Sequence, residues 1–156
     1  MPSGDSVRAF MDKAGRRPFV MPEWIKDGDL ECYVRVTKHR VGDVVACTFD
    51  VANVKVKQRS RRKGVFKVWL AIVEAECDAR GLVVYVESVL NDDLYRFLKA
   101  RGYEDVPGEV NACPCVYRPS SALAKAQGPR VRDPVDVEGV LRDRRLYGDS
   151  YTREDA

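Results

Sequence analysis

The densest group of charged side chains in this 156-residue chain lies in one short loop, and its chemistry is that of an anion binder. Residues 57–64 read Lys-Gln-Arg-Ser-Arg-Arg-Lys-Gly, which places five cations in eight positions directly before an amphipathic pattern. A helix that begins there presents unpaired backbone N–H groups and partial positive charge. Because arginine and lysine surround that helix start, the loop predicts a phosphate ligand.

Carboxylates on the predicted strands are the candidates for a general base, which would remove a proton from a substrate. Asp50 and Glu87 lie nearest the cleft that we expect between two strands, and Glu31 lies on the neighbouring strand. Glu87 stands out because it interrupts an otherwise apolar run. For any one of the three, a solvated or ion-paired acid at a strand edge is the favoured alternative.

Other reactive residue types do not form a recognisable site. His39 is the single histidine, so a histidine-based triad or a histidine-rich metal site lacks its partners, and we expect a solvent-exposed turn residue. Cys113 and Cys115 form a C-x-C pair with no second pair, which favours structural thiols over a metal site. The apolar patterns around Cys47 and Cys77 predict core positions.

Composition favours one globular domain with an appendage. The apolar share is 45%, the charged share is 33%, and the net charge of +3 is too small for a polycation. Five cysteines without a disulfide rhythm favour a reducing compartment. The N-terminal residues lack the apolar run of a signal peptide, and no segment approaches the roughly 20 apolar residues of a membrane span. We therefore expect a cytoplasmic protein without membrane association.

The hydrophobic periodicity predicts a strand–helix–strand core. A hairpin turn at 40–43 separates two strands, a helix crosses to a third strand, and an Asn-capped helix follows. The crossing helix makes the strands before and after it parallel. We predict helices at 5–14, 64–80 and 91–101, strands at 30–40, 44–57, 82–86 and 112–118, and a loop at 15–28.

The chain divides at Pro119. Residues 1–118 form the predicted domain, and residues 119–156 form a C-terminal extension with a linker at 119–129 and a helix at 135–147. The extension carries equal numbers of acidic and basic residues, so it is not a charged arm. Trp24 and Trp69 are both expected in the core. Because no exposed aromatic residue is expected among the cations, the sequence does not indicate recognition of nucleic-acid bases.

Residues 54–103 resemble the GNAT superfamily of acyl-CoA N-acyltransferases. Arg61-Arg62-Lys63-Gly64-Val65-Phe66 supplies the first and fourth positions of the family's Q/R-x-x-G-x-G/A loop, and Asn91–Tyr103 is similar to its Asn-led helix that ends in Gly plus an aromatic residue. The resemblance implies an α/β (α+β) fold. That fold is a mixed, mostly antiparallel sheet with a splayed parallel strand pair, flanked by helices.

The resemblance also implies a transfer of an acetyl or related acyl group from acyl-CoA to an amine by direct attack. Acetyl-CoA or another acyl-CoA is the implied cofactor, held by Val54, Val56, Arg59, Arg61, Arg62, Lys63, Gly64 and Asn91. Glu87 or Asp50 is the implied base and Tyr95 the implied acid. The acceptor is an amine of unknown identity, the assembly is a monomer or homodimer, and the compact size suits a bacterial or bacteriophage protein.

Two positions depart from the family pattern. Phe66 stands where the loop usually has Gly or Ala, and Leu98 stands where many members carry the tyrosine that acts as acid. Tyr95 lies one helical turn before Leu98, about 5 Å away along the axis. These departures motivate an alternative, a catalytically inactive GNAT-fold protein whose basic loop binds nucleic acid or an acidic protein.

Overall fold

A computed structural model describes residues 1–17, 22–107 and 114–126 of the chain. Within them, the strands form one sheet with the order β1-β2-β3-β4-β6-β5. The strands are β1 (Glu23–Asp27), β2 (Leu30–Val41), β3 (Val44–Val56), β4 (Val83–Val86), β5 (Glu104–Asp105) and β6 (Val116–Tyr117). The helices are α1 (Asp5–Arg16), the 3₁₀ turn η1 (Gln58–Ser60), α2 (Val65–Arg80), α3 (Asp92–Ala100) and α4 (Ser121–Ala126). None of the described helices has the length and apolarity to span a membrane.

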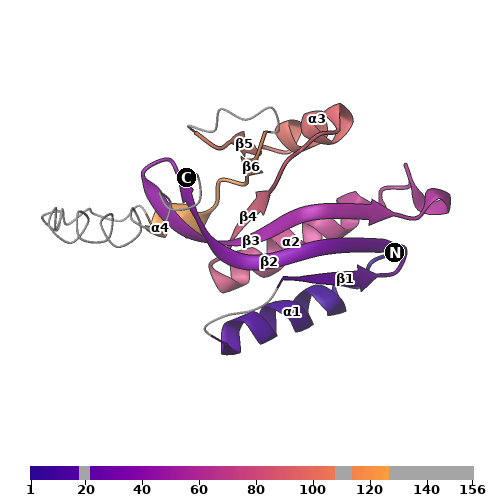
Figure 1. Ribbon diagram of the computed structural model, residues 1–156, viewed down its shortest axis with the longest axis horizontal. Coiled ribbons are helices and arrows are strands. Elements are labelled where there is room, and N and C mark those ends of the chain that lie inside the picture. The colour runs from indigo at the N-terminus through magenta and orange to yellow at the C-terminus, as the bar shows by residue number, and fades with distance from the viewer. Residues whose placement is uncertain (18–21, 108–113, 127–156) are drawn as a thin grey trace, which may run out of the picture.

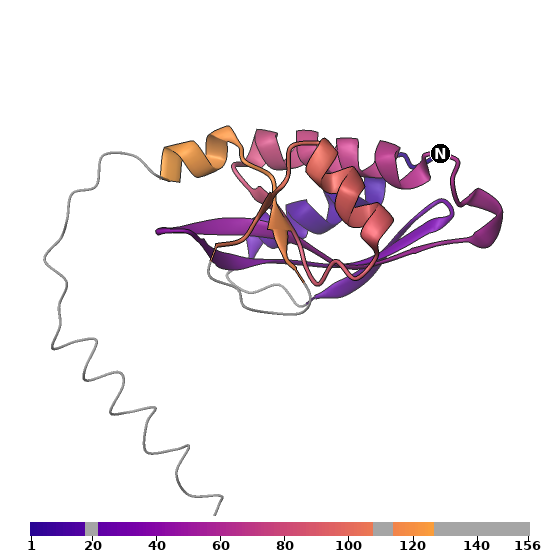
Figure 2. The same ribbon diagram turned by 90° about the horizontal axis from the view of Figure 1, so that it is seen from above.

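The helices α1, α2 and α3 lie on one side of the sheet (Figure 2). Trp69 is fully buried at the centre of the core between α2 and the strands, as its helical phase predicts. A second cluster lies at the hairpin end of the sheet, where Leu123 of α4 packs with Val83 and Tyr85 of β4. Over β1 to β3, no described helix covers the opposite face of the sheet (Figure 1).

The predicted fold class is confirmed by the strand pairing. Strands β1, β2 and β3 are antiparallel, β3 and β4 are parallel, and β6 returns antiparallel to β4. The β3–β4 pair is parallel because α2 crosses over the sheet between them. Only four residues of β3, Thr48–Val51, are paired with four residues of β4, Val83–Val86, and beyond them the two segments diverge.

A bulge in β3 marks the point of divergence. Tyr33 pairs with Asn53 and Val34 pairs with Val51, so Ala52 is the extra residue on β3. A bulge bends its strand and reverses the alternation of side chains. Consequently Phe49 and Val51 before the bulge, and Val54 and Val56 after it, all pack toward the same helix-covered core.

Several predictions from the sequence were wrong. The loop predicted at 15–28 contains β1, and Trp24 on it is 47% exposed rather than in the core. Cys47 is exposed, whereas Cys77 is buried as predicted. The predicted linker at 119–129 contains α4. The predicted helix at 135–147 and Cys113 lie outside the described residues.

Candidate functional site

The loop between β3 and α2 presents free backbone amides. Gly64 has φ +77°, a left-handed conformation, and caps α2 without a side-chain hydrogen bond. The first helical bond runs from the Val68 amide to the Gly64 carbonyl, at 3.0 Å. Among the described residues, no well-aligned hydrogen bond runs from the amides of Val65, Phe66 and Lys67 to a protein acceptor. A Cβ built on Gly64 would meet no atom within 4 Å, so the space before the helix start is open.

Asp29, in the turn between β1 and β2, holds the first half of the loop. Its carboxylate accepts two hydrogen bonds from Arg59, at 3.0 and 2.7 Å, and one from the Ser60 hydroxyl at 2.7 Å. Lys57 Nζ lies 3.2 Å from the same carboxylate. The bonds from Arg59, together with those from Ser60 and Lys57, hold the pKa of Asp29 far below its ordinary value. Arg59, predicted to hold a cofactor, therefore anchors the loop instead of presenting a free cation.

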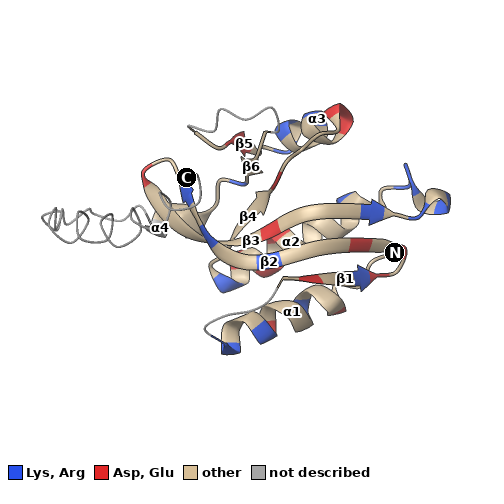
Figure 3. Cartoon of the chain, viewed as in Figure 1, with Lys and Arg blue, Asp and Glu red and all other residues tan. Residues whose placement is uncertain are grey.

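The second half of the loop lines a cavity of about 450 Å³ between α2 and α3. Arg61, Arg62 and Gly64 face it, as does Val56 at the end of β3. Figure 3 shows the lysine and arginine colouring gathered at the end of β3 and in the loop that follows. Lys63 does not line this cavity but an adjoining hollow of about 580 Å³ along α2, which shares Gly64 and Lys67 with it.

Phe66, the residue that departs from the family loop, is accommodated by the core. Its ring centroid lies 6.1 Å from that of Trp69 and 6.1 Å from that of Phe97 on α3. The benzyl group thus packs between α2 and α3 and forms part of the cavity wall. The loop keeps its free amides despite the bulky side chain at this position.

A groove of about 310 Å³ lies where β3 and the chain after β4 diverge. The bond from the Glu87 amide to the Val51 carbonyl, at 3.0 Å, is the last that joins the two segments. The groove is lined by residues of both, among them Val54, Glu87 and Asn91. Leu94 lines both the groove and the cavity at the loop, so the two hollows adjoin.

Asp50 lies beside this groove but not in it. Its side chain is fully buried, and its carboxylate accepts hydrogen bonds from Arg35 Nε at 2.7 Å and from Thr48 Oγ1 at 2.6 Å. His39 Nε2 lies 2.7 Å from the same oxygen as Arg35. Because a carboxylate only accepts, Nε2 must carry a proton. Asp50, predicted as a base, is surrounded by donors and instead positions Arg35 and His39.

Glu87 connects this buried cluster to the groove. The Arg35 guanidinium forms an ion pair with Glu87 Oε1, and His39 Nε2 lies 3.8 Å from the same oxygen. His39, Asp50 and Glu87 bring their ligand atoms within 4.8 Å of one another. The guanidinium binds one oxygen from each carboxylate, so a protein cation already takes the place between them and we propose no metal there.

His39 was wrongly expected in an exposed turn. It lies within β2, its side chain is 24% exposed, and its ring stacks on Tyr85 with centroids 3.9 Å apart. The alternation of β2 places residues 33, 35, 37 and 39 on one face, and this signal was present in the sequence. Its pairing with Asp50 depends on the hairpin register and was not predictable from the local pattern.

Tyr95 does not face the groove. Its hydroxyl donates to both carboxylate oxygens of Asp105 on β5, at 2.8 and 3.0 Å. This bond to Asp105 raises the pKa of Tyr95 above its ordinary value, which weakens it as an acid. Leu98, one turn later, is fully buried. The structure thus does not bring Tyr95 together with Glu87, and Ser88 is the residue with a hydroxyl among the described residues that line the groove.

Comparison with known proteins gave matches among solved structures alone. No family model and no curated protein matches the chain. The chain is similar to a mutant of the AtaT toxin bound to the C-terminus of the antitoxin AtaR and acetyl-CoA, with 14% identity and a TM-score of 0.47. That match covers 64% of this chain and 64% of the AtaT chain, slightly less than two thirds of its length.

Two further matches cover more of the chain. One is Naa20 from Chaetomium thermophilum in complex with a bisubstrate analogue, with 13% identity, 80% of this chain and 78% of that chain covered, and a TM-score of 0.49. The other is the KacTA–DNA complex, with 13% identity, 80% and 86% covered, and a TM-score of 0.47. At such low similarity the assignment rests on the chain's own strand order, parallel pair and splay, which give it a GNAT-like fold.

Proposed function

We propose that this protein is an acyl-CoA-dependent N-acyltransferase of GNAT type that acts on an amine. One observation carries the proposal: free amides at the start of α2 adjoin a groove between two diverging strand segments. Bound acyl-CoA would supply an activated thioester carbonyl. The open space at Gly64 and the cations beside it fit the diphosphate of such a cofactor.

The residues of this chain divide into a phosphate end and a groove end. Arg61, Arg62 and the amides of residues 65–67 would hold the diphosphate, since charged donors and helix-terminal N–H groups converge there. Val54 and Asn91 would flank the arm that runs toward the thioester. Asp29 would contribute indirectly, because it fixes the loop through Arg59.

Glu87 is the proposed base because it lines the groove and is 19% exposed. One of its carboxylate oxygens would accept a proton from the acceptor ammonium, which frees the nitrogen lone pair for attack on the carbonyl carbon. Arg35, itself held by buried Asp50, orients that carboxylate. Ser88 is the proposed donor to the departing sulfur, in place of Tyr95.

Calorimetry with acetyl-CoA tests the binding step. The double variant Arg61→Ala plus Arg62→Ala should weaken binding about 10-fold or more, because two charge-assisted contacts are lost. Arg96→Ala is the matched control, since Arg96 is exposed on α3 and lines neither hollow. Equal affinities of the wild type and the double variant for acetyl-CoA would refute the proposed diphosphate site. Turnover with a panel of amines, measured by thiol release, should fall at least 10²-fold in Glu87→Gln.

One observation favours the alternative of a binding protein without transfer activity. Leu98 is buried and the Tyr95 hydroxyl is bound to Asp105, so the tyrosine acid that many GNAT members use is missing from the groove. This alternative predicts no thiol release with any amine. It also predicts nucleic-acid binding that Arg61→Ala plus Arg62→Ala abolishes.

A further inference from the structure

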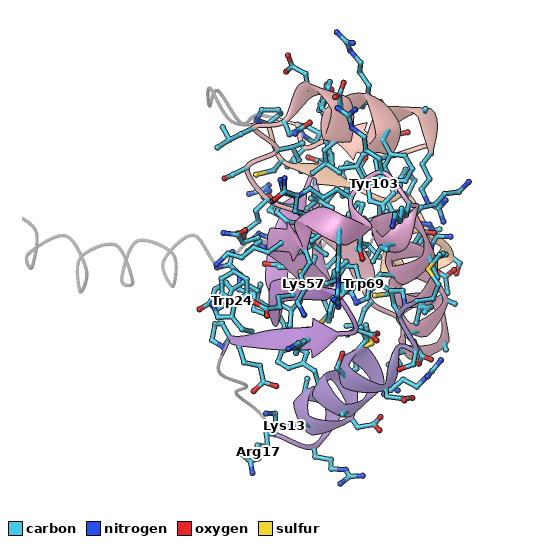
Figure 4. The ribbon with its side chains drawn as sticks, turned by 90° about the vertical axis from the view of Figure 1, so that its right-hand side faces the viewer. Lys13, Arg17, Trp24, Lys57, Trp69 and Tyr103 are labelled. Carbon is cyan, nitrogen blue, oxygen red and sulfur yellow. The ribbon has the colours of Figure 1, made fainter. Side chains whose placement is uncertain are left out.

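An aromatic pair, the exposed Trp24 and the half-buried Tyr33, lies on the face of β1 to β3 that no described helix covers, here termed the open face. Trp24 of β1 is 47% exposed, and its ring centroid lies 5.4 Å from that of Tyr33 on β2 at an interplanar angle of 46°. Figure 4 shows Trp24 at the margin of the molecule, away from the helices, whereas Trp69 lies inside it. An exposed aromatic ring on a sheet face can stack with a planar ligand such as an unpaired base.

Two lysines lie in the row next to this pair. The strand register places Trp24, Tyr33 and Asn53 in one row across the three strands. The next row holds Lys26, Glu31 and Lys55, so two exposed lysines flank one half-buried acid. Lys55 Nζ lies 4.3 Å from the Trp24 ring centroid.

The cations continue beyond this row along β3. Lys57 follows Lys55 by two residues and is also exposed, with its Nζ 3.2 Å from the Asp29 carboxylate. It leads directly into the basic loop at 57–64. The open face therefore combines two aromatic rings, an amide side chain and three lysines.

We propose that the open face binds single-stranded nucleic acid. Unpaired bases stack on exposed aromatic rings, and the backbone phosphates are attracted to neighbouring lysines, which together give binding with little sequence preference. Bases would stack on Trp24 and Tyr33, and phosphates would meet Lys26, Lys55 and Lys57. The site adjoins the groove, which Asn53 also lines, but it shares no residue with the cavity at Gly64, and it does not depend on acyl transfer.

Other occupants fit these features less well. A duplex keeps its bases stacked inside the helix and offers the rings no free base face. An acidic peptide satisfies the lysines but gives the rings no planar partner. A second copy packed on this face would bring two surfaces together on which lysines outnumber acids, which like charges disfavour.

Tryptophan fluorescence provides a direct test, since the chain has two tryptophans and Trp69 is fully buried. A 12-nucleotide oligouridylate should quench the emission of Trp24 on stacking. Three phosphate contacts on a single strand give a log–log salt slope of about −2, so affinity should fall about 20-fold between 50 and 200 mM salt. The same oligonucleotide in a duplex and polyglutamate of equal charge serve as competing ligands, and saturating CoA should leave the affinity unchanged.

Variants separate stacking from charge. Trp24→Ala should weaken oligouridylate binding about 10-fold or more by fluorescence anisotropy of a labelled strand, and Lys55→Gln should reduce the salt slope by about 0.7. Lys99→Gln is the matched control, because Lys99 lies over the Tyr95 ring at 6.0 Å on α3, away from the open face. Thermal unfolding of each variant verifies the fold.

The outcomes discriminate cleanly between the partners. Quenching by the single strand that Trp24→Ala removes and Arg61→Ala plus Arg62→Ala largely retains would support the open face. Absent quenching, equal binding of the duplex or polyglutamate, or binding lost only in the loop variant would overturn the proposal. None of these results depends on whether the protein binds acyl-CoA.

Discussion

Replacement of Asp50 by asparagine tests how much the buried cluster of Asp50 with Arg35, His39 and Thr48 contributes to the stability of the sheet beside the groove. The fully buried carboxylate accepts from Arg35 and Thr48 and lies 2.7 Å from His39 Nε2. Asparagine keeps the shape but removes the charge, and its NH₂ group would point at one of these donors. Loss of one partner of a buried ion pair costs about 3–5 kcal/mol, and we expect the lower end of this range because Arg35 keeps its ion pair with Glu87.

The matched control is Asp78→Asn on the surface. Asp78 accepts from Arg118 at 2.8 Å with a side chain that is 41% exposed, and such pairs contribute about 0–1 kcal/mol. Urea unfolding measures both, and with a slope of about 2 kcal/mol/M the midpoint should fall by about 1.5 M for Asp50→Asn and by less than about 0.5 M for Asp78→Asn. Equal small shifts in the two variants would refute the assignment of Asp50 as the charge that organises Arg35 and His39.

Three further predictions concern stability and the loop. Burial raises the pKa of the Cys32 and Cys77 thiols, so at high pH the unfolded chain loses protons that the folded chain keeps. The free energy of unfolding, measured by denaturant titration, should therefore fall above about pH 8.5, by up to about 1.4 kcal/mol per pH unit for each thiol. Gly4→Ala should lower the free energy of unfolding by about 1–3 kcal/mol, since φ at Gly4 is +82° and the new Cβ would lie 2.5 Å from an isoleucine methyl of α2. In the control Gly15→Ala the new Cβ meets no atom within 4 Å, so the change should be neutral or stabilising. Asp29→Asn should speed amide hydrogen exchange at residues 58–64, and unchanged exchange would contradict the role of Asp29 as the anchor of the loop. Because the pKa of Asp29 is lowered in the folded protein, exchange in the wild-type loop should also become faster as the pH falls below about 4.

The sequence pattern predicted the elements that repeat regularly. The helical spacing of α2, the hairpin of β2 and β3, and the Asn91 cap of α3 are local signals, and the Asn91 side chain indeed accepts from the Leu94 amide at 3.0 Å. The parallel β3–β4 pair followed from the crossing helix. Strand β1 was missed because its five residues lie in a segment that proline and glycine punctuate.

The parts that sequence reasoning missed depend on register and long-range contact. The bulge at Ala52 has no local signature, yet it reverses the faces of β3 and opens the groove. The cluster of Asp50 with His39 joins two strands through the hairpin register. Tyr95 was assigned as acid from its helical phase, which does not reveal that Asp105 of β5 lies within reach of its hydroxyl.

The binding of a diphosphate at the start of α2 is tested most directly by the backbone amides themselves. In a ¹⁵N–¹H correlation spectrum titrated with acetyl-CoA, the amides of Val65, Phe66 and Lys67 should move together and downfield, as N–H groups do on hydrogen bonding to phosphate. Saturating acetyl-CoA that leaves these three signals in place, in a protein whose other signals show a folded state, would contradict the account.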